Sequence, residues 1–149
     1  MSRMRNLMNR LVNTVMIIGT AIVFLGMGSL GEEEPTRIPE PSDDFSATVI
    51  DQRDISSDLR LFSLDGQTFL SGKQGGATVS IPFKNIREIE FYTKDGDLFA
   101  VAVLREGPQV ELKVDKDRVF YGRLPYGVFS IKSEDVRKII ITGLTHQER

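Results

Sequence analysis

The sequence contains no cysteine and only one histidine among its 149 residues. Without cysteine the chain cannot form disulfides, use a thiol nucleophile or bind zinc and iron–sulfur clusters through thiolates. It also lacks the cysteine that carries the lipid of a bacterial lipoprotein. The single histidine, His146, lies in the tail 145–149, and one histidine makes neither a catalytic triad nor a zinc site. We therefore expect no catalytic residues, no metal site and no cofactor.

Acidic side chains outnumber basic ones in most of the chain. Residues 1–31 carry Arg3, Arg5 and Arg10 and no acid, whereas the remaining residues hold 16 basic against 21 acidic side chains, a net charge of −5. An acidic domain repels phosphate backbones. The composition therefore argues against nucleic acid as a partner.

A hydrophobic segment stands near the N-terminus. Residues 14–30 carry no charge and are mostly apolar, with arginines before them and Glu32, Glu33 and Glu34 directly after. This pattern predicts a helix that keeps its N-terminus in the cytoplasm and exports the rest of the chain. Residues 1–31 are then either a signal peptide, cleaved after Gly31, or a membrane anchor that crosses the bilayer with residues 11–30. A buried core helix is the less favoured alternative.

An acidic, proline-rich stretch follows at residues 32–44. It contains three prolines and six acids in thirteen residues, a composition that cannot build a core. We interpret it as a flexible linker that holds a folded domain away from a membrane. The alternative is a disordered start of a cleaved, secreted protein.

From Phe45 onward the pattern indicates an all-β domain, residues 45–144. Short apolar runs alternate with turn residues, and Asp65-Gly66 and Asp95-Gly96 are typical of tight hairpin turns. We expect about ten strands, arranged as a small barrel or sandwich. The predicted strands lie near 47–51, 59–64, 67–73, 77–82, 88–93, 97–105, 109–115, 117–123, 127–132 and 137–142.

The domain contains a weak internal repeat. Residues 58–93 align with 108–143 without a gap, and apolar residues recur at matched positions such as Phe62 and Leu112. The identical pairs are Asp65/Asp115, Gly72/Gly122, Ser80/Ser130, Ile81/Ile131, Arg87/Arg137 and Ile89/Ile139. We therefore expect two similar β units, 45–94 and 95–144, that pack together.

Each unit ends with the same short phrase. An apolar strand runs into a polar break and then into Ile86-x-x-Ile89 or Val136-x-x-Ile139. A spacing of three does not fit a strand, so it predicts a tight turn with both apolar residues directed inward. The phrase resembles small barrels of the SH3-like or PRC-barrel kind, a resemblance that implies no catalytic residues.

Two groups of residues are candidate binding residues. Arg87/Arg137 and Lys73/Arg123 recur in both units, which fits a duplicated contact for an anion or a partner. The alternative is solvent-facing strand charge that protects sheet edges, with Asp51, Asp54 and Asp58 as ion-pair partners. Tyr121 and Tyr126 flank a Gly and a Pro, where they could stack on a sugar or a peptide, or simply pack in a hairpin.

These observations favour a non-enzymatic β module outside the cytoplasm, in the periplasm or at the cell surface. We expect it to mediate protein–protein or assembly contacts in the cell envelope, with another envelope protein or itself as partner. The alternative is a domain that binds a small ligand or a carbohydrate. A small hydrolase is the least favoured function, because no two carboxylates are paired by the sequence.

Overall fold

The computed structural model describes residues 37–145, and these form an all-β domain of ten antiparallel strands. The predictions for the export segment 1–31, for the first part of the linker and for His146 lie outside the described residues. No helix in the part of the chain that is described is long and apolar enough to cross a bilayer.

The ten strands lie at the predicted places. Their bounds are β1 Phe45–Asp51, β2 Ser56–Leu64, β3 Phe69–Gln74, β4 Ala77–Pro82, β5 Ile86–Lys94, β6 Asp97–Leu104, β7 Gln109–Val114, β8 Val119–Leu124, β9 Gly127–Lys132 and β10 Val136–Leu144. Two single-turn 3₁₀ helices, η2 (Phe83–Asn85) and η3 (Ser133–Asp135), precede β5 and β10.

The predicted Asp-Gly turns are confirmed. Asp95 and Gly96 have φ of 51° and 80°, and they join β5 to β6 so that Lys94 pairs with Asp97. Asp65 and Gly66 have φ of 49° and 82° between Leu64 and Gln67. Two successive residues with positive φ match the right-handed twist of the flanking strands.

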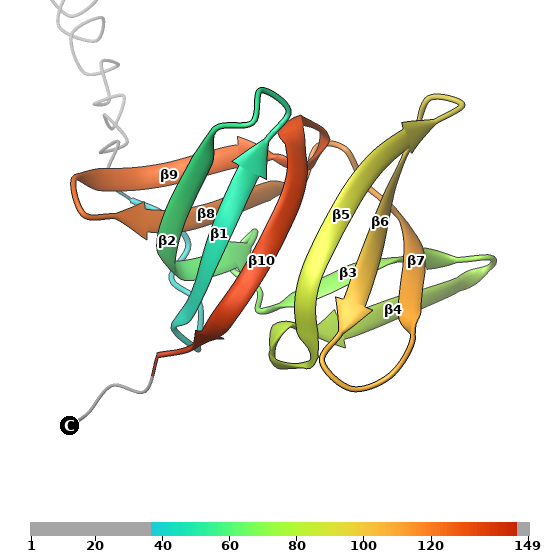
Figure 1. The fold of residues 1–149 in the computed structure, drawn as a ribbon, viewed down its shortest axis with the longest axis horizontal. Coiled ribbons are helices and arrows are strands. Elements are labelled where there is room, and N and C mark those ends of the chain that lie inside the picture. Colours follow the sequence, from blue (N-terminus) through green and yellow to red (C-terminus); the bar gives the residue numbers. More distant parts are fainter. Residues whose placement is uncertain (1–36, 146–149) are drawn as a thin grey trace, which may run out of the picture. The chain divides into compact units, whose positions relative to one another are not determined.

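All ten strands belong to one sheet in the order β4-β3-β7-β6-β5-β10-β1-β2-β8-β9. The sheet is curled into a half-barrel, nearer to the barrel than to the sandwich of our expectation. Five strands that are contiguous in sequence, β3 to β7, lie on one side of the β5–β10 contact, and we name residues 69–114 the continuous half. The other side, residues 45–64 and 119–144, combines β1 and β2 with β8 to β10 and is named the split half (Figure 1).

The phrase around Ile86 and Ile89 differs from the prediction in detail. The tight turn precedes Ile86, as η2, and the spacing of three arises from a bulge in β5, where the register to β6 shifts between Ile86 and Glu88. An extra residue in a bulged strand places side chains three apart on one face. Both isoleucines are fully buried, as expected.

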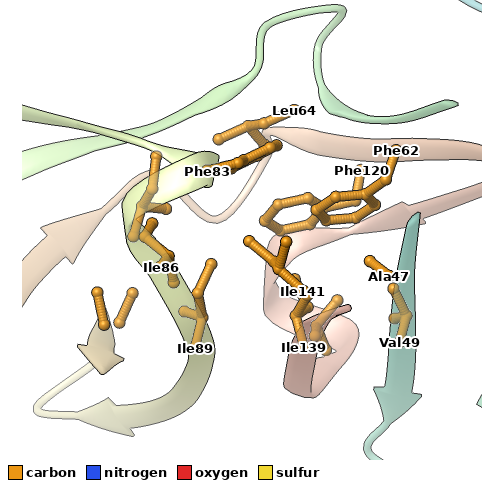
Figure 2. Packing of buried hydrophobic residues seen from close by; sticks show 14 of the residues in the cluster. Ala47, Val49, Phe62, Leu64, Phe83, Ile86, Ile89, Phe120, Ile139 and Ile141 are labelled. Atoms are coloured by element: carbon orange, nitrogen blue, oxygen red, sulfur yellow. The ribbon is translucent and has the colours of Figure 1, made fainter. Parts of the chain in front are cut away.

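The core is one cluster that both halves share. Phe62 stacks on Phe83 and on Phe120, with ring centroids 5.1 and 5.5 Å apart. Ile89 and Ile139 face each other where β5 pairs with β10 (Figure 2). Aromatic and branched side chains from strands far apart in sequence therefore join the two halves into one folded unit.

Candidate binding groove

An open groove lies on the split half, beside β1, β2 and the β8–β9 hairpin. Its volume is about 830 Å³, within the range of roughly 300–1,000 Å³ that ligand pockets occupy. Five apolar residues contribute to its surface: Ala47, Leu59, Leu61, Leu124 and Pro125. Charged and hydroxyl side chains surround them.

The groove owes its shape to a bulge in β2. Arg60 is paired with Arg123 of β8, but the next pairing is Ser63 with Tyr121, so three steps along β2 match two along β8. Leu61 lies within this irregularity with a left-handed φ of 49°. A bulge bends its strand and interrupts the ladder. Its Leu61 N–H donates instead to Asp44 Oδ1, at 2.8 Å.

Asp44 therefore holds the bulge from outside the sheet. Its second oxygen accepts a hydrogen bond from Arg60 Nη2 at 2.5 Å, and its side chain is only 7% exposed. Hydrogen bonds to a charged group are stronger than neutral ones. The carboxylate thus fixes both the backbone at Leu61 and the guanidinium of Arg60.

A glycine beneath the groove lets β8 approach β2 closely. A Cβ at Gly122 would lie 2.8 Å from Leu59 Cβ, closer than real carbon atoms approach. The buried Leu59 therefore packs directly against the backbone of β8. Gly72 makes the corresponding approach in the continuous half, where a Cβ would lie 2.7 Å from Lys113 O.

The remaining charges at the groove differ in how firmly they are held. Asp58 accepts a hydrogen bond from Thr48 Oγ1 at 2.6 Å. Arg123 forms an ion pair with Glu40 at 3.5 Å, and both side chains are well exposed, at 47% and 75%. Exposed pairs of this length contribute little. Arg123 is therefore held more loosely than Arg60.

Three of the predicted binding residues lie at or near the groove. Arg123 lines it, and Tyr126, 85% exposed, follows the lining residue Pro125 in the β8–β9 turn. Tyr121 is half-buried on β8, paired with Ser63 and Ser130.

The other three predicted residues lie elsewhere. Arg137 forms an ion pair with Asp54 at 2.7 Å, one of the acids proposed as partners. Lys73 donates to Thr78 Oγ1 at 2.7 Å. Arg87 is exposed on β5. The six predicted residues therefore do not converge on one site.

Sequence reasoning missed the residues that shape the groove. Asp44 was taken as the last residue of a flexible linker, and Arg60 and Leu61 as ordinary strand residues. The bulge has no local signal, because a leucine at positive φ is uncommon and nothing in its neighbours demands it. The one available hint is the recurrence of Gly72 and Gly122, which marks the close approaches.

Two titratable groups are perturbed, and both lie away from the groove. A hydrogen bond to Glu111, 2.6 Å long, raises the pKa of Tyr92 on β5. Desolvation lowers the pKa of Lys138, but hydrogen bonds with Glu90 and Glu88 outweigh it and raise the pKa overall.

The polar groups of the described domain are paired with one another. Every buried side-chain nitrogen and oxygen in residues 37–145 has a hydrogen-bond partner. Over the same residues, no three His, Cys, Asp or Glu side chains gather in a way that would hold a metal ion. The groove offers apolar surface and charged groups that bond to one another.

Comparison with protein families gives one match. A family model described as "Uncharacterised protein" matches residues 41–143. The chain belongs to this family. The matched span begins before β1 and ends in β10, so it includes both halves of the sheet and Asp44. No curated protein and no solved structure matches the chain.

Proposed function

We propose that this chain is a non-enzymatic interaction module that works outside the cytoplasm, in the cell envelope. The partner is another envelope protein or a second copy of the chain, and the contact surface is the groove of the split half. The observation that carries the proposal is the groove itself, an open surface with an apolar floor beside a bulge of β2.

The contacts around the groove support binding rather than catalysis. A catalyst needs a nucleophile or base aimed at a space where substrate can react. Here Asp44 bonds to Arg60 and Leu61, and Asp58 bonds to Thr48. These carboxylates serve the fold, which leaves shape and apolar contact as the means of recognition.

The location outside the cytoplasm rests on the sequence of residues 1–31. Arginines before an uncharged segment and glutamates after it favour export of everything that follows. A signal peptide and an uncleaved anchor lead to the same side of the membrane, so the proposal holds for both.

We also propose that the domain arose by duplication of a five-strand unit. The bounds of β8, β9, η3 and β10 each lie 50 residues after those of β3, β4, η2 and β5. The strand order is also symmetric. If β1 is exchanged for β6, β2 for β7, β3 for β8, β4 for β9 and β5 for β10, and the order is then read from the opposite edge, the same order results. In this arrangement β1 and β2 lie between β10 and β8 of the second unit, and β6 and β7 lie at the equivalent place between β5 and β3 of the first unit.

The strand register supports the same duplication. Ala47 pairs with Leu59 and Ile141 in the split half, and Ala100 pairs with Leu112 and Phe91 in the continuous half. Val49 pairs with Ile139 as Ala102 pairs with Ile89. In this register Leu112 corresponds to Leu59 and not to Phe62, the residue that the ungapped alignment places opposite it.

Site-directed photo-crosslinking in intact cells tests the proposed contact. The photoreactive residue p-benzoylphenylalanine replaces Pro125 at the groove, and Gln74 on the corresponding β3–β4 hairpin serves as the matched control. We expect the full-length protein to give a discrete heavier adduct from position 125 and none from position 74.

Equal labelling from both positions, or none from position 125, would contradict the groove as a contact surface. Protease added to spheroplasts tests the location in the same cells. Digestion of the β domain without lysis is expected, and protection until lysis would contradict the export proposal.

A small-ligand function is the second candidate, and the volume of the groove favours it. Exposed Tyr126 beside Pro125 would supply a stacking surface for a sugar. Native mass spectrometry of protein purified from its own cells would show a bound mass that is lost on denaturation. Only the unliganded mass is expected for an interaction module.

A further inference from the structure

We propose that the groove receives an extended peptide segment of the partner that combines apolar side chains with a carboxylate, and that Arg123 recognises this carboxylate. The inference rests on the proposed function, since it names the partner chemistry of the same groove.

The apolar part of the peptide is set by the groove floor. Leu61, Leu124 and Pro125 come from β2 and from the β8–β9 hairpin, and they present hydrocarbon rather than hydrogen-bonding groups. Apolar side chains gain free energy in proportion to the area they remove from water, about 25 cal/mol per Å². An entirely polar segment would gain nothing from this floor.

The acidic part follows from the two arginines. Arg60 and Arg123 lie directly opposite each other on β2 and β8, an arrangement in which like charges repel. Buried Asp44 neutralises Arg60, whereas Arg123 has the exposed contact with Glu40 at 3.5 Å. Arg123 therefore loses little when it exchanges Glu40 for another carboxylate, which its planar group can bind in a bidentate manner.

The chain's own residues show what kind of segment fits beside Arg123. Glu40 lies between Pro39 and Pro41, and Pro39 lies close to the Gly66 turn, where an added Cβ would be 2.8 Å from Pro39 Cβ. A proline-flanked glutamate thus already reaches the arginine. A partner peptide with similar chemistry would compete with Glu40 for it.

The continuous half supplies a matched control. Lys73 and Lys113 are opposite each other there, as Arg123 and Arg60 are in the split half. Lys113 pairs with Asp97 and Lys73 bonds to Thr78. The smaller groove beside these two lysines, about 440 Å³, contains Glu111, the counterpart of Asp58 in the split half. The two grooves therefore carry the same pattern of charges. They differ in that Lys73 and Lys113 bond to neighbours on their own half, whereas Arg123 has the long, exposed contact with Glu40.

Fluorescence polarisation with defined peptides tests the inference on the full chain in detergent micelles. The probe is a labelled peptide of alternating leucine and proline with one central glutamate, compared with versions that carry glutamine or lysine there, and with empty micelles. We expect the glutamate peptide to bind on the order of 2- to 5-fold more tightly than the glutamine peptide, as for an exposed ion pair. The lysine peptide should bind most weakly, and 0.5 M salt should remove the preference.

Variants assign the preference to its residue. Arg123→Gln should abolish the difference between the glutamate and glutamine peptides, while Lys73→Gln should leave it intact. Glu40→Gln should tighten binding of the glutamate peptide, because it removes the internal competitor. Circular dichroism melting of each variant reports whether it is folded.

Equal affinity for the glutamate and glutamine peptides would overturn the inference, as would a preference that survives Arg123→Gln in a folded protein. Failure of every peptide to bind would also overturn it. The proposed function is judged separately: a crosslinked partner at position 125 without any acidic preference would retain the interaction module and reject only the role of Arg123.

Discussion

The continuous and split halves share a strand order and register, but their outer faces differ. On β6 of the continuous half, the side chains opposite the buried face are Phe99, Val101 and Val103. At the corresponding places on β1 the split half has Ser46, Thr48 and Ile50. The inward positions are apolar in both, so the two strands share a core pattern while their outer surfaces differ.

The same ion pair is built differently in the two halves. Lys113 and Asp97 pair at 2.9 Å with both side chains about half exposed, at 51% and 47%. At the corresponding place Asp44 is nearly buried and also accepts from the Leu61 N–H. Asp97 is therefore a surface charge, whereas its counterpart Asp44 supports the β2 bulge.

The strongest test of the comparison is Phe62, which directly follows the bulge residue Leu61 in the split half. Phe62 is fully buried between Phe83 and Phe120. Truncation of a buried phenylalanine costs about 3–5 kcal/mol. Phe62→Ala should lower the free energy of unfolding in urea by that amount, and Val101→Ala on the outer face by much less. Similar losses from both would contradict a core that depends on Phe62.

The two close-approach glycines should rank next. In Gly72→Ala the new methyl group meets a backbone oxygen, Lys113 O, at 2.7 Å, whereas in Gly122→Ala the nearest atoms belong to the Leu59 side chain. Overpacking of this kind costs about 1–3 kcal/mol. Both substitutions should destabilise in chemical denaturation, Gly72→Ala more, because backbone moves less readily than a side chain. A larger loss of stability in Gly122→Ala than in Gly72→Ala would contradict this explanation.

The ion pairs give the third test. Asp44→Ala removes the acceptor of the Leu61 N–H and should cost about 1–3 kcal/mol. Asp97→Ala removes an exposed charge and should cost less than about 1 kcal/mol. Thermal unfolding of the two variants side by side measures the difference. Equal effects would mean that the bulge does not depend on Asp44.

The smallest effect concerns Tyr92 on the continuous half. Its hydrogen bond to Glu111 raises its pKa above the ordinary 10.0. A raised pKa in the folded state means that the contribution to stability is present below pH 10 and is lost as the pH rises through the folded pKa. Ultraviolet titration should show this tyrosine ionising at lower pH in Glu111→Gln. An unchanged titration would show that Glu111 does not raise the pKa of Tyr92.

Local features of the sequence were enough to predict the strands and turns. Alternation of apolar and polar residues marked the strands, and Asp65-Gly66 and Asp95-Gly96 marked two reversals, because positive φ is a local demand on residue type. The repeated motif at the start of β5 and β10 was visible from the spacing of its apolar residues, Ile86 and Ile89 in β5.

Strand partnership and the groove were not predictable in this way. Nothing within β1 indicates that it pairs with β10 instead of β5, since both have the same inward pattern of apolar residues. The groove depends on a bulge and on Asp44, which lies 17 residues before Leu61. Such features depend on contacts between segments that are distant in the chain, and a single sequence does not show which segments make contact.

The position of β1 and β2 beside β10 and β8 has a consequence for the order in which the domain is completed during synthesis. All strands of the continuous half have left the ribosome once Val114 is available, because they are consecutive. The first hairpin emerges earliest but must wait for β8 and β10, which are among the last three strands to be made. Pairing across such sequence separation is slow, so β1 and β2 stay open to other chains until translation ends.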